Sequence, residues 1–210
     1  MRLFLSSYRA GNHSDRLVEL FGEGSEVGVI TNGKDHKTPE EREASVDEIL
    51  GFLSNLAMRP VEIDLRPYFQ KPKDTEKLLR KFNALWLADG NTFILRKALA
   101  YSSADQAITK MLKKDKLAYG GESAGAIVAT PSLAGVEFGD DPGLVPKGYK
   151  KALITEGLGL VNFHIVPHYK SEWAGARYML KAIGTNGLEY KTLTNDQAIV
   201  MDGDTAKVLT

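Results

Sequence analysis

The stretch LAYGGESAGAIVA at residues 117–129 places one serine, Ser123, between glycines at a point where a strand is followed by a helix. Its first three residues are apolar and typical of a buried strand, whereas its last six are mostly small residues that favour a helix. Residues 121–125 fit the Gly-x-Ser-x-Gly nucleophile elbow, in which small neighbours allow a sharp turn that exposes the serine hydroxyl. The Ala124 amide would begin the helix and face an oxyanion formed at Ser123. A turn of small residues that only packs a helix against a strand fits the same pattern.

The composition excludes several classes of protein. The 27 Lys and Arg residues balance the 27 Asp and Glu residues, so no net charge attracts nucleic acid or an anionic membrane. The chain of 210 residues has no cysteine, which excludes disulfides, thiolate metal sites and a cysteine nucleophile. No run approaches the roughly 18 apolar residues of a membrane span. We therefore expect a cytoplasmic protein, a monomer or homodimer, that binds neither nucleic acid nor membrane.

Short apolar runs alternate with longer amphipathic segments, which is typical of βαβ units in a parallel sheet. The expected strands are residues 2–6, 26–31, 61–65, 84–88, 116–120 and 162–167. The expected helices are residues 12–22, 40–57, 75–82, 92–100, 103–114, 123–130 and 172–184. Residues 198–209 predict a terminal antiparallel hairpin with an Asp-Gly turn. The sequence thus predicts a single domain over residues 1–210 with a doubly wound α/β fold: a mostly parallel sheet with helices on both faces.

Ligands of an open parallel sheet bind beyond the carboxyl ends of its strands. Ser123 and the turns at residues 88–92 and 167–170 all lie at such ends. In the first of these turns, Gly90 stands between a strand and a helix, where its amide is a candidate second oxyanion donor. Taken alone, the sequence Asp-Gly-Asn-Thr is more often only an ordinary turn with a helix cap.

A hydroxyl nucleophile needs a base, and the chain has four histidines. His168 follows Pro167 at the carboxyl end of a strand, so we predict that it is the base. His164 lies further inside the same strand and is expected to be a hydrogen-bonded structural residue, whereas His13 and His36 lie in polar segments. The spacing of His164 and His168 suits a metal pair on a helix and not on a strand, so we predict no metal site.

Three motifs resemble the peptidase E family of aspartyl dipeptidases, which is related to cyanophycinase and has a fold similar to that of class I glutamine amidotransferases. Residues 121–126 (GESAGA) resemble its nucleophile motif, residues 89–93 (DGNTF) the end of its Gly-Gly-Gly-Asn-Thr-Phe turn, and residues 167–169 (PHY) its Pro-His-Phe motif. The resemblance implies a serine peptidase without a cofactor that hydrolyses small peptides with an N-terminal aspartate. By this resemblance, Ser123 would be the nucleophile and His168 the general base, and the amides of Gly90 and Ala124 would form the oxyanion hole.

The chain departs from the family at two places. Ala88 and Asp89 replace two glycines of the turn, and Asn195 stands at the position of the glutamate that completes the family's triad, with Asp196 beside it. An Asn carbonyl can hold the imidazole tautomer but supplies no charge to an imidazolium. Either Asn195 or Asp196 is therefore expected to orient His168; the next candidates are Glu189 and Asp140.

The same resemblance implies that a cationic side chain binds the aspartyl carboxylate of the substrate. Arg177 is the candidate, because its guanidinium can donate two parallel hydrogen bonds, and Lys170 competes with it. Glu122 would repel an acidic side chain or bind a free amino terminus. Trp173 would line the pocket or belong to the core.

Other functions stay open at this point. One is a different hydrolase on the same scaffold, such as an esterase or a cyanophycinase-like enzyme. Another is a binding protein that has kept the elbow and lost turnover, which the amide at Asn195 makes credible. A glutamine amidotransferase is excluded because it needs a cysteine at the elbow.

Overall fold

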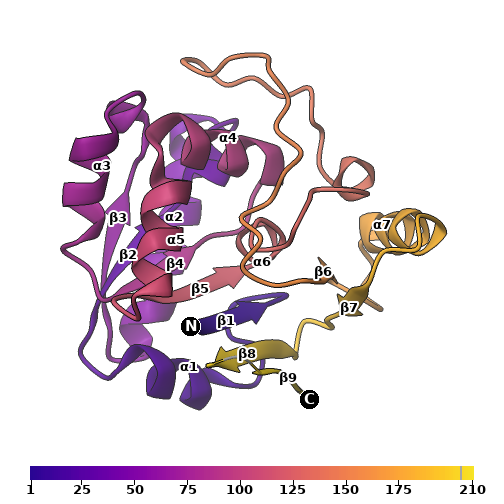
Figure 1. The fold of residues 1–210 in the computed structure, drawn as a ribbon, viewed down its shortest axis with the longest axis horizontal. Helices are drawn as coiled ribbons and strands as arrows, with labels where there is room; N and C mark the ends of the chain where they lie inside the picture. Colours follow the sequence, from indigo (N-terminus) through magenta and orange to yellow (C-terminus); the bar gives the residue numbers. More distant parts are fainter. Residues whose placement is uncertain (204) are drawn as a thin grey trace.

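The computed structural model, which describes residues 1–203 and 205–210, is built around a seven-stranded sheet in the order β3-β2-β4-β5-β1-β8-β9 (Figure 1). The first five strands in this order are parallel, and β8 and β9 form an antiparallel hairpin at the β1 edge. The expected doubly wound, mostly parallel fold with a C-terminal hairpin is confirmed. Asp204, part of the predicted turn, lies outside the described residues. The strands are β1 (Arg2–Ser6), β2 (Glu26–Ile30), β3 (Arg59–Ile63), β4 (Ala84–Leu87), β5 (Ala118–Glu122), β8 (Ala198–Asp202) and β9 (Thr205–Leu209).

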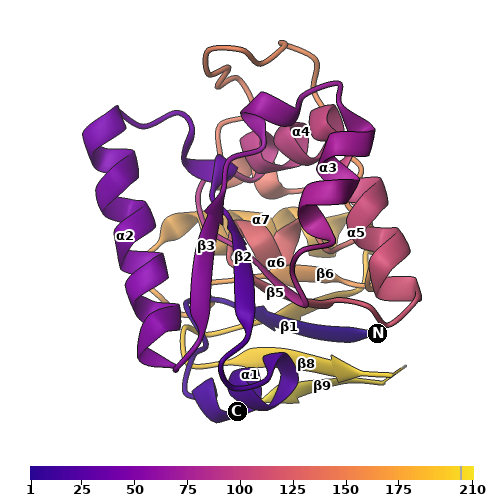
Figure 2. The same ribbon diagram turned by 90° about the vertical axis from the view of Figure 1, so that its left-hand side faces the viewer.

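Helices cover both faces of the sheet. Figure 2 shows α2 on one side of β2 and β3, and α3 and α5 on the other. The helices are α1 (Ser14–Phe21), α2 (Pro39–Asn55), α3 (Pro72–Leu79), α4 (Thr92–Ser102), α5 (Ala104–Lys113), α6 (Ala124–Ile127) and α7 (Ala174–Thr185). None of the helices in the described part of the chain is both long and apolar enough to cross a membrane.

The alternation of side chains along each strand divides the core into two layers. In β1, Leu3 and Leu5 pack with α4, α5 and α6, whereas Phe4 packs with α1 and α2. Trp86 of β4 belongs to the same layer as Phe4, and the rings lie 6.4 Å apart. The central strands lie between helices and are buried on both faces. For this reason nearly all of their residues are apolar.

One predicted strand lies outside the main sheet. The run predicted as strand 162–167 forms only β6 (His164–Val166), which pairs in parallel with β7 (Tyr190–Thr192) in a separate two-stranded sheet. No place next to β1 is free for β6, because β1 pairs with β5 on one side and with β8 on the other. The sequence did not predict β7, whose three residues are all at least partly exposed and lack an apolar pattern.

The strand order brings three loops together at the carboxyl edge of the sheet. β5 lies between β4 and β1, so Ser123 at its end is flanked by the loop after β4 and the loop after β1. The short 3-10 helix η1 (Asn32–Lys34) follows β2 at the same edge. These loops surround Ser123.

Candidate active site

Ser123 occupies a strained turn between β5 and α6. Its φ of 48° and ψ of −109° lie outside the regions that are comfortable for a residue with a Cβ atom. The neighbouring glycines are required by close packing: a Cβ atom on Gly121 would collide with the Gly125 carbonyl, and one on Gly125 would collide with the Leu87 carbonyl. The small residues at the elbow thus let α6 approach β4 and β5 and hold Ser123 in its turn.

His168 follows β6 and reaches the serine. Its Nε2 lies 3.0 Å from Ser123 Oγ, so the hydroxyl can donate to the imidazole. The φ of His168 is 56°, so His168, like Ser123, has a positive value that residues with a Cβ atom seldom adopt. The ring of Trp173 packs edge-on against the imidazole with centroids 5.3 Å apart, and Gly139 and Gly175 leave room for the indole. The structure therefore brings together two residues that are 45 positions apart in the chain.

The other imidazole nitrogen meets Asn195. His168 Nδ1 lies 2.8 Å from Asn195 Oδ1, in the segment between β7 and β8. The Asp196 side chain is exposed and makes no hydrogen bond to the described residues, although its carbonyl accepts from Asn12. Within the described residues, neither Glu189 nor Asp140 makes a hydrogen bond to the imidazole. The main-chain carbonyl of Glu189 accepts from His164 N–H, and the Asp140 carboxylate accepts from Thr92. The orienting contact is thus made by a neutral amide.

Ser7, which the sequence analysis did not single out, completes this group. Its hydroxyl accepts a hydrogen bond from the main-chain N–H of His168 at 2.7 Å and donates one to Asn195 Oδ1 at 3.0 Å. The same oxygen lies 3.4 Å from His168 Nδ1, and the Ser7 residue is fully buried. The signal available in the sequence was its place directly after the first strand, at the edge where the other loops converge.

Two backbone amides near Ser123 remain available to a ligand. Neither Gly90 N–H nor Ala124 N–H donates a hydrogen bond to another described residue. Gly90 has a φ of +129°, and a Cβ atom there would lie 2.6 Å from the Gly33 carbonyl group, so only glycine fits. Asn91 N–H donates to Gly33 O at 2.8 Å, which ties the turn to η1. The Asn91 side chain caps α4 by accepting from Ile94 N–H.

Asp89, one of the departures in this turn, is paired with a lysine. Lys34 Nζ lies 2.6 Å from Asp89 Oδ1, and the lysine side chain is almost completely buried. Lys34 belongs to η1, so this ion pair joins the same two loops as the bond between Asn91 and Gly33. The ammonium opposes the negative charge that Asp89 adds beside Gly90.

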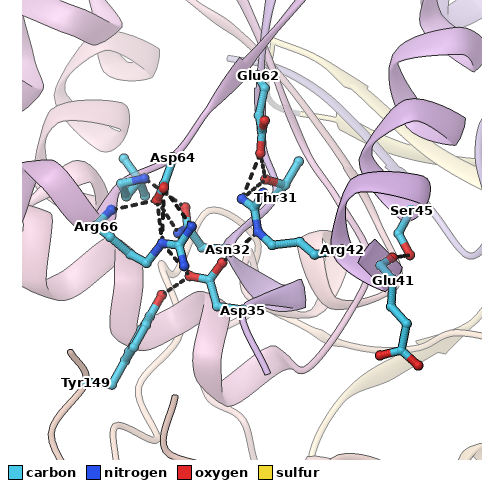
Figure 3. A network of polar contacts seen from close by, with 11 residues as sticks. Thr31, Asn32, Asp35, Glu41, Arg42, Ser45, Glu62, Asp64, Arg66 and Tyr149 are labelled. Carbon is cyan, nitrogen blue, oxygen red and sulfur yellow. Dashed lines mark hydrogen bonds and ion pairs between the residues drawn. The ribbon is translucent and has the colours of Figure 1, made fainter. Parts of the chain in front are cut away.

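A buried network secures η1 from the other side (Figure 3). The carboxylate of Asp35 has no exposed area and accepts from Arg42, Tyr149 and Asn32, at 3.1, 2.5 and 2.8 Å. Arg42, on α2, also bonds to Glu62 on β3 at 2.7 Å. The network therefore links α2, β3 and the long segment that carries Tyr149 to the loop against which Gly90 packs.

Glu122, directly before the nucleophile, lies in the interior. Both of its oxygens accept hydrogen bonds: Oε1 from the Arg9 guanidinium at 2.8 Å and from Trp86 Nε1 at 3.2 Å, and Oε2 from Arg9 N–H at 2.8 Å. Burial and the nearby Asp89 carboxylate raise the pKa of Glu122, and the Arg9 guanidinium opposes this shift. A direct contact with substrate would require Arg9 and Trp86 to release the carboxylate.

The two candidate cations for a substrate carboxylate are both exposed. Arg177 is the fourth residue of α7 and makes no hydrogen bond or ion pair with the residues that the structure describes. Lys170 follows His168 closely, and its ammonium lies 5.5 Å from the centroid of the Tyr169 ring. His164 has the structural role expected for it, since its Nε2 lies 2.9 Å from Ser132 Oγ and the residue is buried.

The comparisons with known sequences agree on one family of enzymes. A model described as Peptidase family S51 matches residues 38–209. A protein named "Uncharacterized peptidase Lin0382" from Listeria innocua is 29% identical over 150 residues, which cover 71% of this chain and 68% of that protein. A protein named "Probable alpha-aspartyl dipeptidase" from Drosophila melanogaster is 34% identical over 122 residues, which cover 58% of this chain and 47% of that protein. The second alignment thus spans about half of the fly protein.

Solved structures are similar over nearly the whole chain. The crystal structure of a "Putative Peptidase E Protein" from Listeria monocytogenes superposes with a TM-score of 0.79 and 25% identity, covering 99% of this chain and 97% of that one. A peptidase from an acI-B1 actinobacterium superposes with a TM-score of 0.70 over 99% of this chain and 86% of that one. At 13% identity, the second likeness concerns the fold alone.

Proposed function

This chain belongs to peptidase family S51, to which the match over residues 38–209 assigns it, and we propose that it hydrolyses peptides with Ser123 as nucleophile and His168 as general base. The observation that carries the proposal is the 3.0 Å approach of His168 Nε2 to the hydroxyl of a serine held at a strained elbow. A nucleophile and a base within hydrogen-bond reach, with the base oriented by a third group, is the arrangement that activates a serine.

The proposed reaction has two stages. Ser123 Oγ attacks the carbonyl carbon of the scissile peptide while His168 Nε2 takes the hydroxyl proton. The amides of Gly90 and Ala124 stabilise the negative charge that forms on the carbonyl oxygen. The imidazolium then gives its proton to the leaving amine, which leaves an acyl group on Ser123. In the second stage, His168 takes a proton from a water molecule as the water oxygen attacks the acyl carbon; the imidazolium then returns the proton to Ser123 Oγ as the ester bond breaks, which releases the carboxylic acid product and regenerates both residues.

The proposed substrate is a small peptide that begins with aspartate, hydrolysed in the cytoplasm. Support comes from the similarity to the fly protein named as an alpha-aspartyl dipeptidase and from the exposed guanidinium of Arg177, which can bind a carboxylate through two hydrogen bonds. Each step of this reaction is assigned to the chain's own groups, so we expect a chelator to leave turnover unchanged.

The nucleophile is tested with a fluorophosphonate that labels activated serines. We expect the parent to be labelled at Ser123, and Ser123→Ala or His168→Ala to remove the label. Ser54→Ala, at an exposed position on α2, is the matched control and should label like the parent. Equal labelling of the parent and both site variants would show that the site is assigned wrongly.

Specificity is tested with a panel of aminoacyl anilides. Asp-anilide should be the preferred substrate, and Arg177→Ala should raise its KM at least about tenfold while leaving fluorophosphonate labelling intact. Lys181→Ala is the control, because Lys181 is exposed on the same helix. A panel without an Asp preference, or an unchanged KM for Arg177→Ala, would favour an esterase or another small-substrate hydrolase.

The neutral amide of Asn195 favours one second candidate, a binding protein of low turnover on the same scaffold. An amide gives no full charge to stabilise an imidazolium beside it. This candidate predicts binding of acidic peptides to the parent without fluorophosphonate labelling. Labelling at Ser123 excludes it in the same experiment.

A further inference from the structure

We propose that Ser7 is a positioning residue that sets the orientation of the Asn195 amide and, through it, the tautomer of His168. The inference rests on the proposed role of His168 as the base. Its geometric basis is that the Ser7 hydroxyl touches both partners: it accepts from His168 N–H at 2.7 Å and lies 3.0 Å from Asn195 Oδ1.

The orientation of Asn195 matters because the two ends of an amide are nearly the same size and opposite in polarity. When Oδ1 faces the imidazole, it accepts from Nδ1–H, and Nε2 keeps the lone pair that takes the proton of Ser123. When the NH₂ end faces the imidazole, Nδ1 must accept, and the proton of the neutral ring moves to Nε2. A histidine with its proton on Nε2 cannot act as a base toward Ser123.

Ser7 distinguishes the two orientations because a hydroxyl has a single proton. One lone pair of Ser7 Oγ is occupied by His168 N–H, and its proton goes to Asn195 Oδ1. If the amide were reversed, its NH₂ group would donate to both Ser7 Oγ and His168 Nδ1. Among the described residues, the buried Ser7 proton would then face only His168 Nδ1, at 3.4 Å, and the single lone pair of that nitrogen would already be taken by the NH₂ group.

A carboxylate at position 195 would not need this selection, because both of its oxygens accept. The role of Ser7 is therefore specific to a triad that is completed by an amide. The two possible roles of Ser7 can therefore be distinguished. If Ser7 only supports the loop through its bond from His168 N–H, its effect should be the same whichever residue stands at position 195. If Ser7 selects the orientation of the amide, its effect should depend on Asn195.

The experiment is a double-mutant cycle of Ser7→Ala and Asn195→Asp, with kcat and KM measured on one peptide. Ser7→Ala alone should lower kcat about ten- to a hundredfold with little change in KM, because part of the population holds the wrong tautomer. In the Asn195→Asp background, Ser7→Ala should lower kcat less than about threefold. Equal losses in both backgrounds would overturn the proposal and assign Ser7 a loop-supporting role.

A second measurement does not require activity. The ¹⁵N chemical shifts of the His168 imidazole report which nitrogen carries the proton, and they can be recorded in Ser123→Ala protein. The parent tautomer should be Nδ1–H, and Ser7→Ala should move the population toward Nε2–H. An unchanged tautomer in folded Ser7→Ala protein would overturn the proposal. Because Ser123 is already removed here, a positive result stands even if Ser123 is not the nucleophile.

Discussion

At the scale of single residues, the unusual feature of the site is the amide that meets His168. The 2.8 Å contact from Nδ1 to Asn195 Oδ1 holds the ring without placing a negative charge beside it. The transition state for proton transfer carries positive charge on the imidazole, which an adjacent carboxylate stabilises and an amide does not. Since Asn and Asp have the same shape, the charge can be added here without moving other groups.

We therefore expect Asn195→Asp to raise kcat about tenfold, which corresponds to about 1.4 kcal/mol of barrier. Asp196→Ala is the control and should change kcat less than about twofold, because its exposed carboxylate makes no hydrogen bond within the described residues. Both variants are compared with the parent on one substrate at one pH. A loss above about 10²-fold in Asp196→Ala would instead make Asp196 the orienting acid.

At the scale of elements, the elbow depends on how closely α6 approaches the sheet. Gly125 on α6 lies against the Leu87 carbonyl at the end of β4, and no side chain fits between them. Gly51 on α2 has no such constraint, because no heavy atom lies within 4 Å of a Cβ atom added there. One glycine is thus required by packing, and the other only weakens its helix.

The free energy of unfolding should report this difference. Gly125→Ala is expected to lower it by about 3 kcal/mol, because the methyl group collides with backbone that cannot move independently. Gly51→Ala should raise it by about 0.5–1 kcal/mol through helix propensity. Urea denaturation of both variants measures the two values. Equal and small effects would mean that α6 can shift away from β4 at little cost.

At the scale of the whole molecule, several polar contacts hold the segment between α6 and β6 against neighbouring elements, and two of them lie close to the candidate site. Tyr149 donates to the buried carboxylate of Asp35 at 2.5 Å, as Figure 3 shows. Asp140 accepts from the N–H and the hydroxyl of Thr92 at the start of α4. Asp35 follows η1, and Thr92 begins α4; both of these elements adjoin the Gly90 turn. The two contacts therefore link this segment to the candidate site.

Tyr149→Phe removes one of these contacts. We expect it to lower the free energy of unfolding by about 1–2 kcal/mol, since Asp35 loses a donor in a buried position but keeps Arg42 and Asn32. Tyr178→Phe is the control, because Tyr178 is 58% exposed on α7. Urea denaturation distinguishes them. If the two variants were equally stable, the contact between Tyr149 and Asp35 would contribute nothing.

Asp140 gives the stability a pH dependence. Burial raises the pKa of Asp140 above its ordinary value of 3.8, although its bonds from Thr92 and the nearby histidines oppose the shift. A carboxyl group with a raised pKa in the folded state favours folding below its ordinary pKa and loses that contribution as the pH rises through the raised value. Asp140→Asn keeps an oxygen acceptor and cannot ionise. Its free energy of unfolding should therefore increase relative to the parent from pH 4 upward, and a difference independent of pH would contradict this.

Local patterns in the sequence were enough to predict most of the helices and strands and to single out Ser123 and His168 as candidates. Short apolar runs predicted the central strands, and the glycines around Ser123 predicted a sharp turn because only small residues fit where a helix approaches a sheet so closely. The end of a strand predicted that His168 would face the same edge, and the structure places its Nε2 3.0 Å from Ser123 Oγ. These features depend on neighbours along the chain, which a sequence displays directly.

The tertiary structure decided what depends on distant partners. The place beside β1 is taken by β8, so β6 pairs with β7 instead of joining the main sheet. Which of the adjacent residues Asn195 and Asp196 meets His168 depends on the path of one loop, because neighbouring side chains point in different directions. Ser7 reaches His168 across 161 positions, a contact that no spacing in the sequence reveals because it arises only when β1 and β6 are packed into one molecule.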